Sequence, residues 1–115
     1  MKDYELEKTM AWIWLLSAGI FEIFFATTLK LSEGFTKPVY TVLFIITAAL
    51  SFYCLTKAMQ SIPIGTAYAV WTGIGAAGVV VFGMLLFSEP VNLLRLFFLT
   101  TLVGSIVGLK LVSPS

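Results

Sequence analysis

The chain has 115 residues, of which 59% are hydrophobic and only 11% are charged, and its net charge is +1. So few charged residues cannot cover a water-soluble domain, which leaves a soluble helical core as the weaker alternative to a membrane protein. The near-neutral charge argues against nucleic acid as a partner. Cys54 is the single cysteine and histidine is absent, so we expect no intrachain disulfide, no metal site and no cofactor.

Four apolar stretches follow one another along the chain, each close to the roughly 20 residues that a helix needs to cross a bilayer. They predict membrane-spanning helices at about 11–30, 38–61, 64–87 and 91–111. The polar residues 1–9 precede the first span, and Met10 would be a natural start without them. We therefore expect a polar N-terminal extension, 1–9, followed by a single four-helix transmembrane domain, 10–115.

The segments between the predicted spans are short and contain helix breakers such as Gly34, Pro38, Pro63 and Pro90. Short connections make consecutive spans antiparallel neighbours, so the expected fold is an all-α four-helix bundle in contact with membrane lipid.

The positive charges are divided almost evenly between the two ends of this bundle. Cytoplasmic loops of membrane proteins carry an excess of lysine and arginine, which sets their orientation. Here one end has Lys2, Lys8, Lys57 and Lys110, and the other has Lys30, Lys37 and Arg95. So small a difference predicts that the chain inserts in both orientations.

Glu22 is the only ionisable side chain between Lys8 and Lys30, and it lies near the middle of the first span. A charged carboxylate at that depth costs roughly 2.5–3.5 kcal/mol on insertion scales. Lys30 is eight residues away and can reach the membrane surface, so it is a poor partner for a static ion pair. The alternative is a carboxylate satisfied within the fold, but the position favours a path for protons or cations through the membrane.

The helical face around Glu22 is lined mainly by small residues. Positions three or four apart share a face, which places Ala18, Gly19, Phe25 and Ala26 beside the carboxylate. This leaves room for a substrate or a neighbouring helix.

The third span combines small residues with an aromatic pair. Gly65, Ala69, Gly73 and Ala77 recur every four residues and predict close helix packing, while Gly73, Gly75 and Gly78 allow a local bend.

Tyr68 and Trp71 share a face of the same span. They are either part of an interfacial aromatic belt or, as we favour, ring faces for an organic cation. In the second span, Ser51, Phe52 and Tyr53 are consistent with ordinary packing.

The fourth span has Gly104 and Gly108, a small-xxx-small pair that predicts a dimer interface. The motif is common in membrane helices and is weak by itself. Four short helices are too few to enclose a water-filled path, however, so an oligomer is expected on that ground as well.

These segments together resemble the small multidrug resistance family of bacterial exporters, over nearly all of residues 10–115. The resemblance rests on Gly19-x-x-Glu22 followed by Lys30, the loop 32–36, the run 63–75, and the terminal Gly108-Leu109-Lys110. Within the family, Trp71-Thr72-Gly73 and the terminal Gly-Leu-Lys are similar to the guanidinium-exporter branch.

The resemblance implies an antiparallel, dual-topology dimer in which both copies of the glutamate face one shared site. By position, Glu22 would bind the cation or protons, Tyr68 and Trp71 would line the pocket, and Ser51 would hydrogen-bond near the carboxylate. Some family members work as unlike pairs, so a heterodimer with a related chain is an alternative to a homodimer.

The same resemblance implies that Gly19 allows close approach of a neighbouring helix and that Gly73 and Gly75 lie at the bend of the third helix. Lys110 matches a signature of the branch. One pocket position departs from the branch, which typically has tryptophan where this chain has Phe25. The substitution removes an indole N–H donor beside the carboxylate.

We therefore expect a transporter of the bacterial inner membrane that exports guanidinium or small substituted guanidinium cations in exchange for protons, by alternating access. A proton-coupled multidrug exporter of quaternary ammonium or other lipophilic cations is the first alternative, which Phe25, Thr27, Thr28 and the loop 32–36 favour. A non-transporting membrane scaffold protein is the alternative from another class.

Overall fold

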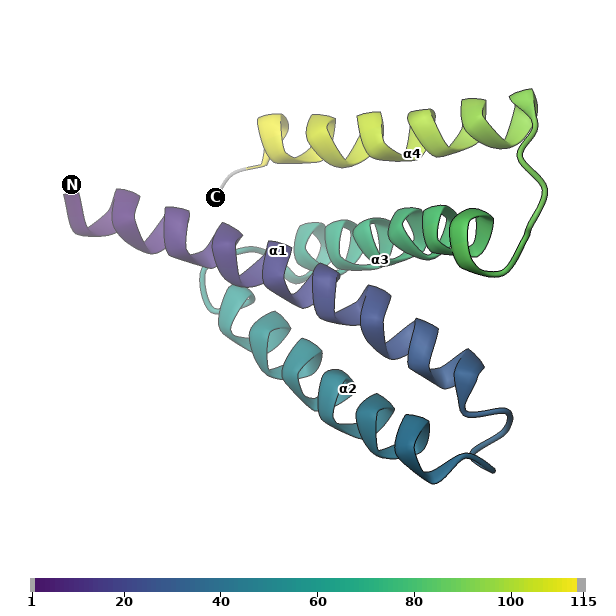
Figure 1. Ribbon diagram of the computed structural model, residues 1–115. Helices are drawn as coiled ribbons and strands as arrows, with labels where there is room; N and C mark the ends of the chain where they lie inside the picture. The colour runs from purple at the N-terminus through teal and green to yellow at the C-terminus, as the bar shows by residue number, and fades with distance from the viewer. Residues whose placement is uncertain (1, 114–115) are drawn as a thin grey trace.

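The computed structural model describes residues 2–113, which form four helices joined by short connections (Figure 1). The helices are α1 (Lys2–Leu31), α2 (Pro38–Ala58), α3 (Ile64–Leu86) and α4 (Leu93–Val112). All four are long and apolar enough to cross a membrane. The predicted all-α architecture with four membrane-spanning helices is confirmed.

The observed helix ends differ from the predicted spans by more than one residue at three places. α1 continues without a break through the polar extension, so its first turns lie before the predicted span. α2 ends at Ala58, three residues before the predicted position. The amide N–H of Gln60 bonds the Lys57 carbonyl at 3.3 Å, which is a tighter turn than an α-helix. Pro63 disfavours helical backbone at the residue before it and so fixes the turn.

The third difference lies at the start of α4. Its first helical residue is Leu93, two residues later than predicted, because Asn92 caps the helix. The side-chain oxygen of Asn92 accepts the backbone N–H of Arg95 at 2.8 Å. Arg95 also forms an ion pair with Glu89.

α1 lies between α2 and α3, whereas α4 runs beside α3 and away from α2 (Figure 1). The main cluster of buried hydrophobic residues lies where α1 crosses α2 and α3, toward the end of the bundle that holds the α2–α3 turn. They are Ala11, Trp12, Leu15, Ala18, Cys54, Leu55, Ala58, Ile62, Ala67, Val70 and Trp71. α4 has no fully buried residue among those that the structure describes. Its outer face is therefore open in the single chain.

Candidate functional site

The carboxylate of Glu22 lies in the part of α1 predicted to span the membrane, near the middle of 11–30, and faces α3. Its Oε1 atom is buried and has no hydrogen-bond partner within residues 2–113. The backbone of Gly75 forms the facing surface, and a side-chain carbon added there would overlap the carboxyl group. Glycine at this position is what allows α3 to approach the acid so closely. A buried acceptor without a donor is costly, so the position favours a bound cation or a proton.

A hydroxyl beside this position connects three helices. Ser51 of α2 is completely buried and donates to the Ala18 carbonyl oxygen of α1 at 2.7 Å. It also accepts the indole N–H of Trp71 from α3 at 3.0 Å. The hydroxyl thus donates one hydrogen bond and accepts one, which holds the Trp71 ring in one orientation. The structure therefore gives Ser51 a contact with Trp71, and its role near the carboxylate stays a prediction.

A continuous series of aromatic rings extends from Phe25 across α2 to α3. The Phe25 ring lies 6.0 Å from those of Phe44 and Phe52, measured between ring centres. The Phe52 ring lies 5.6 Å from that of Trp71, and Trp71 lies 5.5 Å from Tyr68. Phe25 thus points toward α2, while Glu22 points toward α3. Tyr68 remains mostly exposed in the single chain.

Two further glycines permit close contact between helices. A side-chain carbon at Gly19 would stand 2.6 Å from Ile74 of α3, and one at Gly73 would stand 2.8 Å from Ile106 of α4. Both distances are too short for real atoms, so both positions require glycine or a shift of the neighbouring side chain. α3 is one uninterrupted helix from Ile64 to Leu86. The bend expected at Gly73 and Gly75 stays a prediction.

The remaining candidate residues lie away from the carboxylate. Gly104 and Gly108 on α4 have no atom within 4 Å of the position where a side chain would begin. Lys110 places its amine 5.1 Å from the centre of the Trp12 ring, which ties the end of α4 to α1.

Three contributions to this region were not predicted from the sequence. The Ala18 carbonyl accepts from Ser51, Phe52 joins Phe25 to Trp71, and Gly75 contacts the acid directly. The glycine could have been found only by knowing how α1 and α3 are rotated against each other. The contribution of Phe52 could have been suspected from the sequence, because the residue is aromatic and adjacent to Ser51.

Comparisons with known proteins identify the family of the chain. A family model described as "Small Multidrug Resistance protein" matches residues 10–102. The chain belongs to the small multidrug resistance family. It is accordingly a multi-pass protein of the bacterial inner membrane and a transport protein, not an enzyme.

Several curated relatives match this small multidrug resistance protein over almost their whole length. A protein of Proteus vulgaris named "Guanidinium exporter" is 45% identical over 104 residues, which cover 90% of this chain and 100% of the relative. A "Guanidinium exporter" of Citrobacter freundii is 45% identical, covering 89% of this chain and 97% of the relative. A Bacillus licheniformis protein named "Probable guanidinium efflux system subunit GdnD" is 44% identical, with coverage of 90% and 100%.

Proposed function

We propose that this protein exports guanidinium or small substituted guanidinium cations in exchange for protons. The observation that carries the proposal is the buried, unpartnered oxygen of Glu22 at the middle of a membrane-spanning helix. An acceptor in that environment is stabilised by a proton or by a cation that donates hydrogen bonds, and guanidinium presents a planar set of such donors. The names of the relatives support the same cation.

Exchange follows from competition for the same carboxylate. A proton neutralises Glu22, and a cation needs it charged, so binding of one releases the other. An empty charged site is expensive in the membrane, which suppresses movement of the unloaded protein. Alternating exposure of the site to the two sides of the membrane then couples proton entry to cation export.

The other candidate residues would shape the site around the carboxylate. Ser51 holds the Trp71 indole, so that the ring presents a fixed face to the cation. Tyr68 is close enough to Trp71 to extend that face. Phe25 contributes apolar surface and no hydrogen-bond donor.

We infer that the working unit is an antiparallel dimer in which two copies of Glu22 share one site. The open face of α4 with Gly104 and Gly108, and the exposed ring of Tyr68, both fit burial against a second chain. A heterodimer with a related chain is the second possibility. It is favoured by the Bacillus licheniformis relative, whose name describes a subunit of an efflux system.

Transport in liposomes tests this function. Vesicles that contain the protein and guanidinium, diluted into guanidinium-free buffer, should acidify inside as protons enter in exchange. Glu22→Gln should abolish the acidification because it removes the charge that both ligands need. Glu33→Gln alters an exposed carboxylate in the α1–α2 connection and should leave it intact. Acidification that survives Glu22→Gln would contradict the proposal.

Export of quaternary ammonium ions is the second candidate function, and the aromatic series ending at Phe25 favours it. Such ions offer apolar surface and no N–H donors, so they suit rings better than hydrogen-bonding groups. Phe25→Trp should shift selectivity toward guanidinium, as measured by the ratio of guanidinium to tetraphenylphosphonium binding. Phe24→Trp is the matched control, because Phe24 is exposed and packs against Phe82. An unchanged ratio would show that Phe25 does not determine which cation is bound.

A membrane scaffold without transport activity makes the opposite prediction. Its cellular function would be unaffected by Glu22→Gln.

A further inference from the structure

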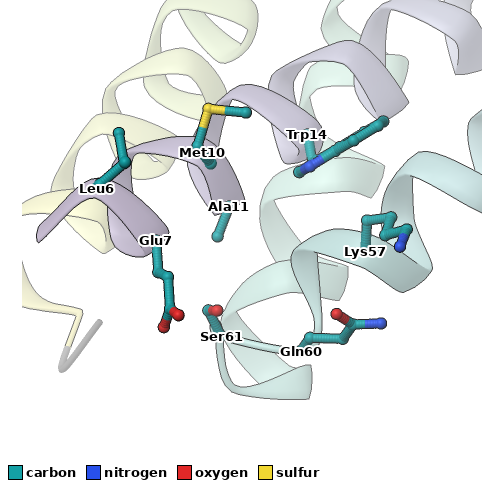
Figure 2. A pocket seen from close by; sticks show the side chains of 8 residues that line it. All are labelled: Leu6, Glu7, Met10, Ala11, Trp14, Lys57, Gln60 and Ser61. Atoms are coloured by element: carbon teal, nitrogen blue, oxygen red, sulfur yellow. The ribbon is translucent and has the colours of Figure 1, made fainter. Parts of the chain in front are cut away.

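A pocket of about 480 Å³ lies at the other end of α1, away from Glu22. Its volume is within the roughly 300–1,000 Å³ of small-molecule sites. Its walls come from the first turns of α1 and from the end of α2 with the following turn (Figure 2). The residues that line it include Leu6, Glu7, Met10, Trp14, Lys57 and Gln60.

The pocket depends on the N-terminal extension. Leu6 and Glu7 lie before residue 10, where the match to the family begins, and α1 carries them as a continuous helix. It is therefore a feature of this chain's own extension and is separate from the transport site proposed above.

Opposite charges line this pocket without pairing to each other. Figure 2 shows Glu7 on one side and Lys57 with Gln60 on the other. Among the side chains that the structure describes, 3–113, the ion pairs are Lys37–Glu33 and Arg95–Glu89, so Glu7 and Lys57 do not form one. The Lys57 amine instead lies 5.7 Å from the centre of the Tyr53 ring. A ligand that carries both a cation and an anion would satisfy both groups.

The third property is an apolar wall beside the start of the apolar run of α1. Leu6, Met10 and Trp14 recur every four residues and so share one face of α1, and Leu6 and Met10 are 61% and 44% exposed. The apolar run of α1 begins at Met10, and tryptophan is typical of the membrane–water interface. A soluble zwitterion has no apolar part that would cover this surface, whereas the glycerol and upper acyl chains of a lipid would cover it.

We propose that this pocket binds the headgroup of a phospholipid with a primary ammonium group, of the phosphatidylethanolamine class. The ammonium would donate to Glu7, the phosphate would accept from Lys57 and Gln60, and the acyl chains would follow Met10 and Trp14 into the bilayer. A choline headgroup has no N–H to donate to Glu7. A glycerol headgroup has no cation, and its phosphate would be repelled by Glu7.

Native mass spectrometry of the full-length protein tests this assignment. The protein is delipidated and offered equal amounts of phosphatidylethanolamine, phosphatidylcholine and phosphatidylglycerol with identical acyl chains. A charged hydrogen bond is lost with either wrong headgroup, so phosphatidylethanolamine should be retained about tenfold more strongly. Equal retention of phosphatidylcholine or phosphatidylglycerol would overturn the proposal.

Variants separate the pocket from general surface charge. Glu7→Gln should reduce the preference for phosphatidylethanolamine over phosphatidylcholine to within about twofold, and Lys57→Gln should weaken retention of all three lipids. Glu5→Gln removes a carboxylate from the same extension but outside the pocket, so it should change nothing. An effect of Glu5→Gln equal to that of Glu7→Gln would refute a specific site. Acidification in the guanidinium liposome assay verifies that each variant is folded.

Two further arms identify the source of the headgroup. Soluble glycerophosphoethanolamine, which lacks the acyl chains, should not displace the lipid, and displacement at equal concentration would overturn the lipid assignment. Guanidinium should not displace the lipid from the Glu22→Gln variant. If it does, the pocket is a site for soluble cations and the lipid proposal is wrong, whatever the outcome for transport.

Discussion

The Ser51 hydroxyl occupies the meeting point of three helices. It belongs to α2, donates to a carbonyl of α1 and accepts from the Trp71 indole of α3. In the membrane there is no bulk water to replace these hydrogen-bond partners. A single small side chain therefore fixes both the helix contact and the orientation of a ring in the proposed site.

Ser51→Ala should weaken guanidinium binding and lower stability together. The change leaves the buried Trp71 N–H without an acceptor, at a cost of about 1–3 kcal/mol. Ring orientation is lost at the same time, so guanidinium affinity should fall several-fold. Unfolding in mixed detergent micelles and calorimetric titration measure the two effects. Thr56→Val is the control, because this exposed threonine of the same helix donates only to the Phe52 carbonyl of its own helix. Equal effects of the two variants would contradict the role of Ser51.

Guanidinium affinity should depend on pH through Glu22. Protonation removes the carboxylate charge, so acid competes with the cation and alkali favours it. Below the pKa of the carboxylate each pH unit should weaken binding by up to about tenfold for one competing proton, and above it binding should level off. Titrations between about pH 4 and about pH 9 measure the dependence. Glu22→Gln should bind weakly at every pH, and a wild-type affinity that is constant over this range would rule out proton coupling.

Sequence was sufficient to single out Glu22, because the cost of a carboxylate in the membrane depends only on its place in the span. It also placed Tyr68 and Trp71 on one face, since their spacing is local. It could not give the partner of Ser51. That hydroxyl was expected near the acid, and only the packing of α2 against α1 and α3 shows its contact with Trp71.

Among the helices, α1 extends beyond the segment that hydrophobicity alone predicts. The run of apolar residues predicted its transmembrane part, but residues 2–9 are polar and gave no signal of packing. They continue the helix because they include good helix formers, and Asp3 and Glu5 lie in the first turn where acidic side chains are favourable. The division at residue 10 into extension and transmembrane domain stays a prediction. The starts of α2 and α3 were predictable from Pro38 and Pro63.

The contact between α1 and α3 depends on glycine at position 75. Gly75→Ala would place a methyl group on the Glu22 carboxylate, which must then move or separate the helices. We expect guanidinium affinity to fall at least about tenfold and stability to fall by about 1–3 kcal/mol. Binding and micelle unfolding measure both.

Gly65→Ala provides the matched control for this change. Gly65 lies in the first turn of the same helix and has nothing within 4 Å of an added side-chain carbon. Alanine is the better helix former, so stability should stay within about 1 kcal/mol of the unchanged protein. If Gly75→Ala were equally harmless, the close approach of α3 to the acid would have no functional importance.

At the scale of the whole molecule, two features of the single chain support the proposed pairing with a second copy. α4 presents an open face with Gly104 and Gly108, and the positive charges are nearly balanced between the two ends. A chain without a preferred orientation supplies both members of an antiparallel pair from one sequence. The two features together explain why a dimer of opposite orientations is the assembly that we propose.

Charge variants test this assembly. Tyr4→Lys with Glu5→Lys makes the end that carries the N-terminus more positive, and Thr36→Lys with Ser88→Lys and Val91→Lys does the same for the other end. Each set should fix one orientation, as measured by labelling of introduced cysteines from one side of the membrane. Cells that produce either set alone should then be sensitive to guanidinium, whereas cells that produce both sets should regain resistance because opposite orientations are again available.

The control for this experiment combines each charge set with Glu22→Gln. Cells that produce both of these combined variants should remain sensitive, because no intact carboxylate is present in either copy. Restoration by the charge sets alone would therefore report export that needs the Glu22 carboxylate. Full resistance from one fixed orientation by itself would contradict the antiparallel dimer, since two copies in the same orientation would then be sufficient for export.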